Sequence, residues 1–147
     1  MELSPRPGGL FALGFGGDTL NTSVYMARLG VAVDYLTAQG DDPISRRMID
    51  AWRAEGVGVG EVRRLPARLP GLYLIETDER GERRFSYWRD RAPARELFAL
   101  PDTPALAEAI AGYDLVYLSG ISLSLYGKDG RRTLMQALDA QRARGGL

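Results

Sequence analysis

A glycine-rich turn followed by polar side chains stands near the start of the chain, at residues 14–21 (GFGGDTLN). Gly16 and Gly17 would let backbone N–H groups approach a ligand closely, and a helix N-terminus favours an oxygen-rich or anionic group. Asp18 and Asn21 can hydrogen-bond hydroxyl groups and lie one helical turn apart. A plain glycine turn with Asp18 as the helix cap explains the same residues, so both interpretations stay open on residue types alone.

The same turn also begins a dinucleotide-binding fingerprint at residues 14–16. Thr19 stands where the third glycine of that fingerprint belongs. A nicotinamide-dependent enzyme is therefore disfavoured.

A second set of polar side chains, Tyr73, Tyr87 and Arg89, falls on one face of a predicted β-hairpin, because side chains of a strand repeat every two residues. An arginine is a two-pronged donor suited to carboxylate or phosphate, and two tyrosines beside it can hydrogen-bond a polyol. The alternative is an amphipathic hairpin with ordinary cross-strand pairs and a solvated arginine. Residue types alone leave that alternative open.

The composition excludes several other classes of site. The 147 residues include no cysteine and no histidine, which removes cysteine nucleophiles, disulfides, Cys/His zinc sites and a Ser-His-Asp triad. Acid–base catalysis would have to use Asp, Glu, Tyr or the one lysine, Lys128. Lys128 is more simply explained as a solvated residue at the start of a helix. The 19 basic and 19 acidic residues leave no net charge, so we expect no nucleic-acid partner. Without a secretory signal or an apolar run of roughly 20 residues, we expect no membrane partner and a cytoplasmic location.

Alternating helical and strand-like segments predict an α/β fold with a mostly parallel sheet. Periodicity, caps and stops predict helices at 18–29, 43–55, 103–111 and 128–144. Apolar runs predict parallel strands at 31–37 and 114–119, and three further strands with no helix between them at 62–65, 72–77 and 83–89. Residues 1–9 and 120–127 are predicted to be loops. The carboxylate pair at residues 41 and 42 is better explained by a helix cap than by a metal site.

The last two predicted strands form the hairpin, with Gly81 in the left-handed position of a three-residue loop. Its register pairs Tyr73 with Tyr87, Ile75 with Phe85 and Glu76 with Arg84. The aromatic, apolar and opposite-charge pairs favour that register. The other face carries Leu72, Leu74 and Trp88. A hairpin that is apolar on both faces needs cover on both, so we expect a ligand on one and a partner chain on the other.

These segments together resemble the PfkB-type (ribokinase-like) carbohydrate kinases. The N-terminal signature of that family is Gly-Gly, an Asn soon after and two later glycines. Here it reads GGDTLNTS at residues 16–23, followed by Gly30 and Gly40, with Thr19 in place of the usual small residue or proline. The blocks GGDTLNTSVYMARLG, GDDP, RLPGLYLIETDERGER, YWR and YLSGISL are similar, in the same order, to the 2-keto-3-deoxygluconate kinase branch.

The resemblance implies a fold and a site. It implies a mostly parallel sheet flanked by helices, with the α/β body in residues 1–61 and 91–147 and a small β-sheet lid in residues 62–90. It also implies that the substrate is contacted by Gly16, Gly17, Asp18 and Asn21 from the body and by Tyr73, Tyr87 and Arg89 from the lid. In this family the lids of two subunits often pack together, which implies a homodimer or a higher homo-oligomer.

The chain departs from the family in length. Members are much longer, begin with a strand of the form G-E-x-M, and end with a Gly-Ala-Gly-Asp segment. The Asp of that segment is the general base, and its glycine amides form an anion hole. Neither segment is present. We therefore expect a fragment, incomplete at the C-terminal end, whose catalytic Asp lies beyond Leu147 and in which no catalytic residue or metal ligand can be named.

Two functions remain. The first is a fragment of a carbohydrate kinase that phosphorylates 2-keto-3-deoxygluconate or a related sugar acid with ATP and Mg²⁺, both bound mainly by the missing half; the chain alone would be inactive. The second is a non-catalytic sugar-acid-binding module that lacks a kinase half. A GAGD-like segment beyond Leu147 would support the first, and an in-frame stop would support the second.

Overall fold

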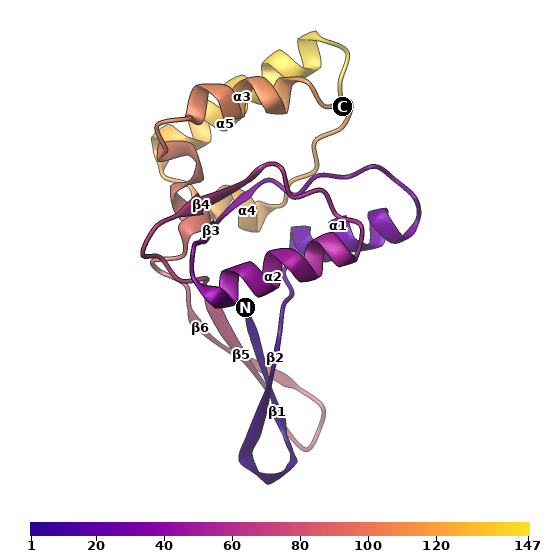
Figure 1. The fold of residues 1–147 in the computed structure, drawn as a ribbon, viewed down its shortest axis with the longest axis vertical. Helices are drawn as coiled ribbons and strands as arrows, with labels where there is room; N and C mark the ends of the chain where they lie inside the picture. Colours follow the sequence, from indigo (N-terminus) through magenta and orange to yellow (C-terminus); the bar gives the residue numbers. More distant parts are fainter.

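The computed structural model describes all 147 residues. Its α-helices are α1 (Asp18–Arg28), α2 (Pro43–Ala54), α3 (Thr103–Ala111), α4 (Gly120–Leu125) and α5 (Lys128–Ala143). Its strands are β1 (Glu2–Arg6), β2 (Leu10–Gly14), β3 (Thr37–Gly40), β4 (Val62–Leu65), β5 (Leu72–Thr77) and β6 (Arg83–Trp88), with 3₁₀ helices η1 (Pro7–Gly9) and η2 (Pro93–Ala99). A narrow arm of β-strands projects from a body of helices and short strands (Figure 1). None of the helices combines the length and the apolar character needed to cross a membrane.

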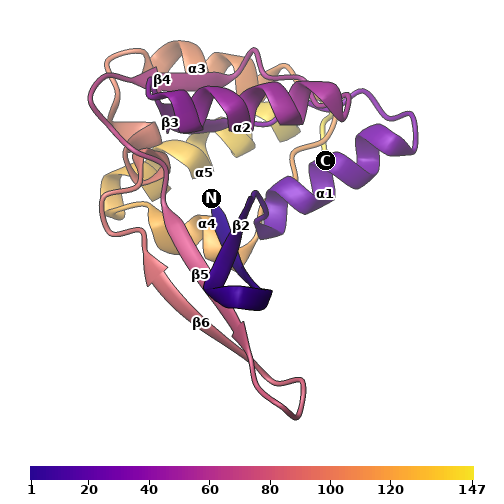
Figure 2. The same ribbon diagram turned by 60° about the horizontal axis from the view of Figure 1, so that its bottom comes forward.

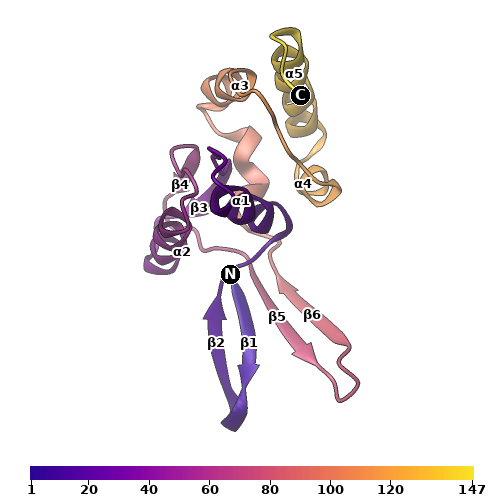
Figure 3. The same cartoon turned by 90° about the vertical axis from the view of Figure 1, so that its right-hand side faces the viewer.

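The arm is a four-stranded sheet in the order β2-β1-β5-β6, which we call the lid sheet. β1 and β2 form one antiparallel hairpin, β5 and β6 form another, and β1 joins the two by running parallel to β5. The two hairpins hang side by side below the body (Figure 3). The predicted loop at residues 1–9 is therefore wrong. Gly8 and Gly9, with φ values of 77° and 73°, turn the chain back between β1 and β2. The strand β1 was missed because its other partner, β5, lies far along the sequence, so no local pattern indicates the pairing.

The hairpin of β5 and β6 has the predicted register. Tyr73 lies opposite Tyr87, and Ile75 lies opposite Phe85. Gly81 has a φ of 85°, so it occupies the predicted left-handed position in the turn. Both features are confirmed, because they depend on residues that are close together in the sequence.

The strand β4 belongs to the body. It pairs in parallel with β3, with Thr37 opposite Val62, in a separate two-stranded sheet. Leu65 at its end is buried in the core of the body. Grouping residues 62–65 with the lid strands is therefore wrong, because burial of an apolar residue holds this strand against the body.

The helices α1 and α2 pack together around one of two hydrophobic cores. The Asp42 carboxylate caps α2 by accepting hydrogen bonds from the N–H groups of Ile44 (2.9 Å) and Ser45 (3.1 Å), as predicted. Trp52 of α2 and Leu20 of α1 are both buried in this core. Burying a side chain such as that of Leu20 stabilises the fold by about 1.5–3 kcal/mol. This packing fixes α1, and with it the glycine-rich turn that precedes it.

The second core lies among η2, α3 and α5. The helices α3 and α5 run beside each other (Figure 1), and Figure 2 shows them behind β3 and β4, with α2 in front. Leu106 of α3 and Leu134 of α5 are buried there beside Leu97 of η2. The predicted helices at 103–111 and 128–144 are confirmed. The predicted loop at 120–127 is wrong, because Ser119 caps the short helix α4 by accepting from the Ser122 N–H at 3.3 Å.

Two segments predicted as parallel strands remain largely unpaired. Residues 31–36 pair only at one bridge, between Asp34 and Gly58, and regular pairing begins at Thr37. Residues 114–118 form no strand. Their apolar composition suits buried strands, but a strand forms only where neighbours take up its backbone hydrogen bonds. In this structure a cleft separates the two segments.

Candidate functional site

The glycine-rich turn before α1 meets the lid sheet at Tyr73. The Tyr73 hydroxyl donates a hydrogen bond of 2.6 Å to the Glu2 carboxylate. A Cβ atom on Gly16 would lie 2.7 Å from that hydroxyl and 3.8 Å from Asn21 Oδ1. A side chain has no room at 2.7 Å, so only glycine lets the turn lie this close to the sheet. The structure thus brings together three predicted site residues: Gly16, Asn21 and Tyr73.

The ionisation of Tyr73 follows from its surroundings. Partial burial, followed by the hydrogen bond to the Glu2 carboxylate, raises the pKa of Tyr73 above its ordinary value of 10.0. Both causes favour the neutral phenol, which keeps its proton under physiological conditions. Tyr73 therefore presents a hydroxyl group, and not a phenolate, to the space above the turn.

Tyr87 and Arg89 extend the same face of the lid sheet. The rings of Tyr73 and Tyr87 have centroids 6.3 Å apart. The Arg89 guanidinium carbon lies 4.1 Å from the centroid of the Tyr87 ring, within the range of a cation–π contact. None of the salt bridges in the structure involves Arg89. Its guanidinium is therefore available for a two-pronged contact with an anionic group.

The helix α1 begins at Asp18, directly after the glycine-rich turn that packs against Tyr73. Gly17 is its N-cap residue, and no side chain caps the helix. The interpretation of Asp18 as the cap is therefore wrong; its side chain is exposed and makes no hydrogen bond to the lid sheet. The first backbone N–H to make an intrahelical hydrogen bond is that of Asn21, which donates to the Gly17 carbonyl at 2.8 Å. The N–H groups of residues 18–20 are left as donors for a ligand.

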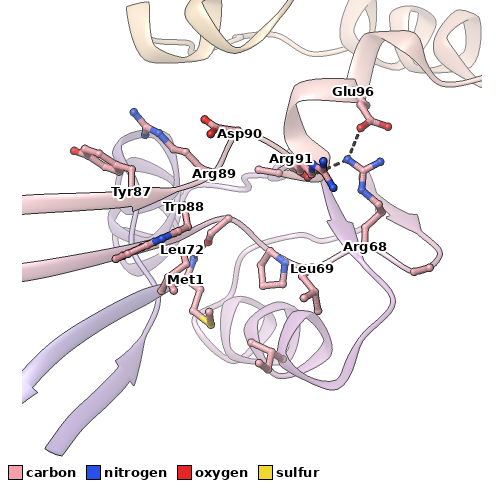
Figure 4. Close-up of a pocket in the computed structure, with 15 residues that line it drawn as sticks. Met1, Arg68, Leu69, Leu72, Tyr87, Trp88, Arg89, Asp90, Arg91 and Glu96 are labelled. Carbon is pink, nitrogen blue, oxygen red and sulfur yellow. Dashed lines mark hydrogen bonds and ion pairs between the residues drawn. The ribbon is translucent and has the colours of Figure 1, made fainter.

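An open cavity of about 1000 Å³ lies where the lid sheet joins the body. Its walls include Arg68, Leu72, Tyr87, Trp88 and Arg89. Figure 4 shows Tyr87 and Arg89 projecting together to one side of the strands, with Trp88 toward the other side. Arg68 is engaged elsewhere, because it pairs with Glu96. Arg89 and Arg91 are the two arginines of this cavity without an acidic partner.

Reasoning from the sequence missed Glu2. It lies at the start of a segment predicted to be a loop, and 71 residues separate it from Tyr73. Nothing in the local pattern signals the contact, because it depends on the pairing of β1 with β5. An acidic residue at a strand start would have been a signal only if that pairing had been known.

In sequence, the chain is similar to known sugar kinases. It is 46% identical over 150 residues to 2-dehydro-3-deoxygluconokinase of Escherichia coli K12, covering 99% of this chain and 48% of that protein. It is 36% identical to the protein of the same name from Haemophilus influenzae, with 99% and 48% covered. It is 33% identical to a fructokinase of Klebsiella pneumoniae, with 89% and 40% covered. The chain spans about half the length of the curated relatives it matches.

Solved structures share the fold. A PfkB protein from a Polaromonas species superposes with a TM-score of 0.83 at 20% identity, over 99% of this chain and 50% of that one. The 2-dehydro-3-deoxygluconokinase of Thermotoga maritima gives 0.80 at 22% identity, over 99% and 45%. The predicted ribokinase-like α/β fold is confirmed. A sequence profile of the pfkB family of carbohydrate kinases matches residues 5–146, and the chain therefore belongs to that family.

Proposed function

We propose that the protein containing these residues is an ATP-dependent kinase of 2-keto-3-deoxygluconate or a related sugar acid. Support comes from the relatives named 2-dehydro-3-deoxygluconokinase, which are up to 46% identical and cover 99% of the chain. The structural observation that carries the proposal is the Arg89 guanidinium, which has no acidic partner and lies 4.1 Å from the Tyr87 ring centroid. A sugar acid offers a carboxylate to such a group, whereas a neutral sugar does not.

In this proposal the turn before α1 forms the floor of the site. Gly16 and Gly17 keep the floor free of side chains, so the sugar can lie against the backbone. The free N–H groups at the start of α1 donate to sugar oxygens. The side chains of Asp18 and Asn21, one helical turn apart, hydrogen-bond sugar hydroxyls.

The lid sheet covers the sugar from the other side. Tyr73 accepts a hydrogen bond from a sugar hydroxyl at its phenol oxygen, because it donates its one proton to the Glu2 carboxylate at 2.6 Å. Tyr87 adds a second hydroxyl and an aromatic surface. Arg89 grips the carboxylate of the substrate through two N–H groups. These contacts orient the acid sugar, which is one of the two sources of rate in phosphoryl transfer.

ATP with Mg²⁺ would supply the phosphoryl group and neutralise its charge. No three His, Cys, Asp or Glu side chains of this chain gather in one place, so it holds no metal cage made of protein ligands alone. Lys128, the only lysine, is exposed at the start of α5. We therefore assign these residues to binding and orientation, and no catalytic residue or metal ligand to this chain. Because ATP is abundant in the cytoplasm, we also propose that location.

The apolar face of the lid sheet is proposed as a homodimer contact. Leu13, Leu3 and Leu74 lie in register across three strands. Leu72 lies opposite Trp88 on the same face, and Trp88 is 58% exposed. A second copy of the lid would remove this surface from water, and a two-fold axis would set the patch against itself.

The test is a phosphorylation assay on the protein extended to the full length of its relatives. We expect ATP consumption with 2-keto-3-deoxygluconate and little with fructose, and none with residues 1–147 alone. A full-length protein that prefers fructose would contradict the acid-sugar assignment. A protein that binds the acid without consuming ATP would support a non-catalytic binding module instead.

A further inference from the structure

The carboxylate of Glu2 is held at both of its oxygens on the face of the lid sheet that carries Tyr73. Glu2 lies opposite Tyr73 in the parallel pair of β1 and β5. Its Oε2 accepts from the Tyr73 hydroxyl at 2.6 Å, and its Oε1 accepts from the Ser4 hydroxyl at 2.9 Å. Because Glu2 and Ser4 are two residues apart on one strand, they share this face. The two hydrogen bonds together fix the orientation of the carboxylate.

This carboxylate has no cationic partner. None of the salt bridges in the structure involves Glu2, although its side chain is half-buried. The glycine-rich turn limits the space around it, since a Cβ atom on Gly16 would lie 3.1 Å from Glu2 Oε2. Burying a charge costs free energy unless hydrogen bonds compensate for the lost water. Two neutral hydroxyl groups provide that compensation here, so the negative charge stays in place beside the proposed sugar site.

Glu2 also decides in which direction the Tyr73 hydroxyl forms its hydrogen bonds. A phenol has one proton to donate, and an ionised carboxylate can only accept. The proton of Tyr73 is therefore committed to Glu2, and only the lone pairs of the phenol oxygen remain for a ligand. Burial, followed by this hydrogen bond, raises the pKa of Tyr73, which keeps the proton on the phenol.

We propose that Glu2 is a positioning residue, which acts through Tyr73 to make this part of the site select a hydroxyl group and reject an oxygen that carries no proton. The inference rests on the proposed function. A substrate hydroxyl can donate to the phenol oxygen. An unprotonated oxygen in the same place would face lone pairs and the negative charge of Glu2, and its own hydrogen bond would be lost.

The orientation of the acid sugar follows from this selection. 2-Keto-3-deoxygluconate has a carboxylate at one end and hydroxyl groups along the other part of its carbon chain. The charge of Glu2 repels the carboxylate from Tyr73, whereas Arg89 attracts it. The Tyr87 ring is next to both residues, with its centroid 6.3 Å from that of Tyr73 and 4.1 Å from the Arg89 guanidinium carbon. The substrate therefore binds along this face in one direction, with its carboxylate at Arg89 and a hydroxyl at Tyr73.

Fluorinated analogues of 2-keto-3-deoxygluconate test the selection, because fluorine accepts a weak hydrogen bond and cannot donate one. Each analogue would have one hydroxyl replaced, and calorimetric titration of the full-length protein would give its affinity. We expect one analogue to bind roughly tenfold more weakly than the parent sugar acid. Glu2→Met removes the acceptor but keeps much of the side-chain volume. Its penalty for that analogue should fall to about twofold, because the Tyr73 proton is then free to turn toward the ligand.

Tyr73→Phe shows whether Glu2 acts through the phenol. The penalty should also be small in this variant, and adding Glu2→Met should change the selectivity no further. Glu76→Gln is the matched control, because it removes a carboxylate from the opposite face of β5 and should leave the penalty unchanged. The proposal is overturned if Glu2→Met weakens every ligand by the same factor, as a purely structural role would. It is also overturned if Glu2→Met alters the selectivity equally in the Tyr73→Phe background.

A measurement without sugar separates this inference from the proposed function. Carbon-13 NMR of the ring carbon that bears the hydroxyl follows the ionisation of Tyr73, whose signal is identified by its absence from Tyr73→Phe. Glu2→Met leaves the burial but removes the hydrogen bond, so the pKa of Tyr73 should fall. An unchanged pKa would overturn the inference. A fall in the pKa in a protein that binds no sugar acid would contradict the proposed function and leave the link between Glu2 and Tyr73 standing.

Discussion

The Tyr73 hydroxyl and the Glu2 carboxylate meet at 2.6 Å across the parallel pair of β1 and β5, although 71 residues separate them in the sequence. The backbone of Gly16 packs closely against the same two groups. Two lid strands and the turn before α1 therefore share one contact. The position of the Tyr73 hydroxyl over the proposed sugar site depends on all three.

Gly16→Ala should weaken this junction. The new Cβ would lie 2.7 Å from the Tyr73 hydroxyl and 3.1 Å from Glu2 Oε2, so the turn and the lid must separate. We expect a loss of about 1–3 kcal/mol in the free energy of unfolding by urea, together with weaker binding of 2-keto-3-deoxygluconate in calorimetric titration. Gly14→Ala is the matched control, because its Cβ meets nothing within 4 Å. Equal effects at the two positions would contradict the close packing of the turn.

Arg89→Ala should change selectivity more than stability. The loss of a charge-assisted hydrogen bond costs about 1.5–3 kcal/mol, or roughly 10- to 150-fold in affinity. We expect that loss for the acid sugar and little change for a neutral sugar of similar size, measured by titration of the full-length protein. Arg80→Ala, in the exposed hairpin turn, should leave both affinities unchanged. Equal weakening of the acid and the neutral sugar by Arg89→Ala would remove the carboxylate role.

Tyr126 should make the fold sensitive to alkali. Its ring packs edge-on against Phe98, with centroids 4.8 Å apart, and burial raises the pKa of its phenol to about 12. The folded state thus keeps this proton at a pH where the unfolded chain has lost it. The stabilisation is complete below pH 10 and is lost as the pH rises from about 10 to about 12.

Tyr126→Phe tests this dependence. The variant should reduce the fall in unfolding free energy between those pH values by up to about 1.4 kcal/mol per pH unit. Urea denaturation at several pH values would measure it. An unchanged slope in Tyr126→Phe would show that the buried phenol is not the group responsible.

Trp88→Glu should separate the proposed dimer. A carboxylate at the centre of an apolar contact is costly to bury, so sedimentation of the full-length protein should shift toward monomer while circular dichroism stays native. Thr77→Glu is the control, because it places the same charge at an exposed position near the tip of the hairpin. An unchanged dimer would reject the lid contact, and global unfolding would show that Trp88 packs within its own subunit.

Local sequence determined a good part of this protein. The register of β5 and β6 follows from cross-strand pairs that are close in sequence and from Gly81, which has a φ of 85°. The start of α2 follows from the Asp42 carboxylate, which caps N–H groups two and three residues later. Each helical hydrogen bond joins residues four positions apart, so the sequence features that predict a helix lie within a few positions of one another. Strand periodicity placed Tyr73, Tyr87 and Arg89 on one hairpin face, but only the family resemblance joined that face to the turn at Gly16.

Tertiary structure alone decided which strands pair. It placed β1 beside β5 and so brought Glu2 to Tyr73, and it assigned β4 to the body through its pairing with β3. It also left residues 31–36 and 114–118 without partners along the cleft, although their composition is that of buried strands. The physical reason is that a strand takes its hydrogen bonds from other segments, which are often distant in the chain. Whether an apolar run becomes a strand therefore depends on neighbours that its own residues do not specify.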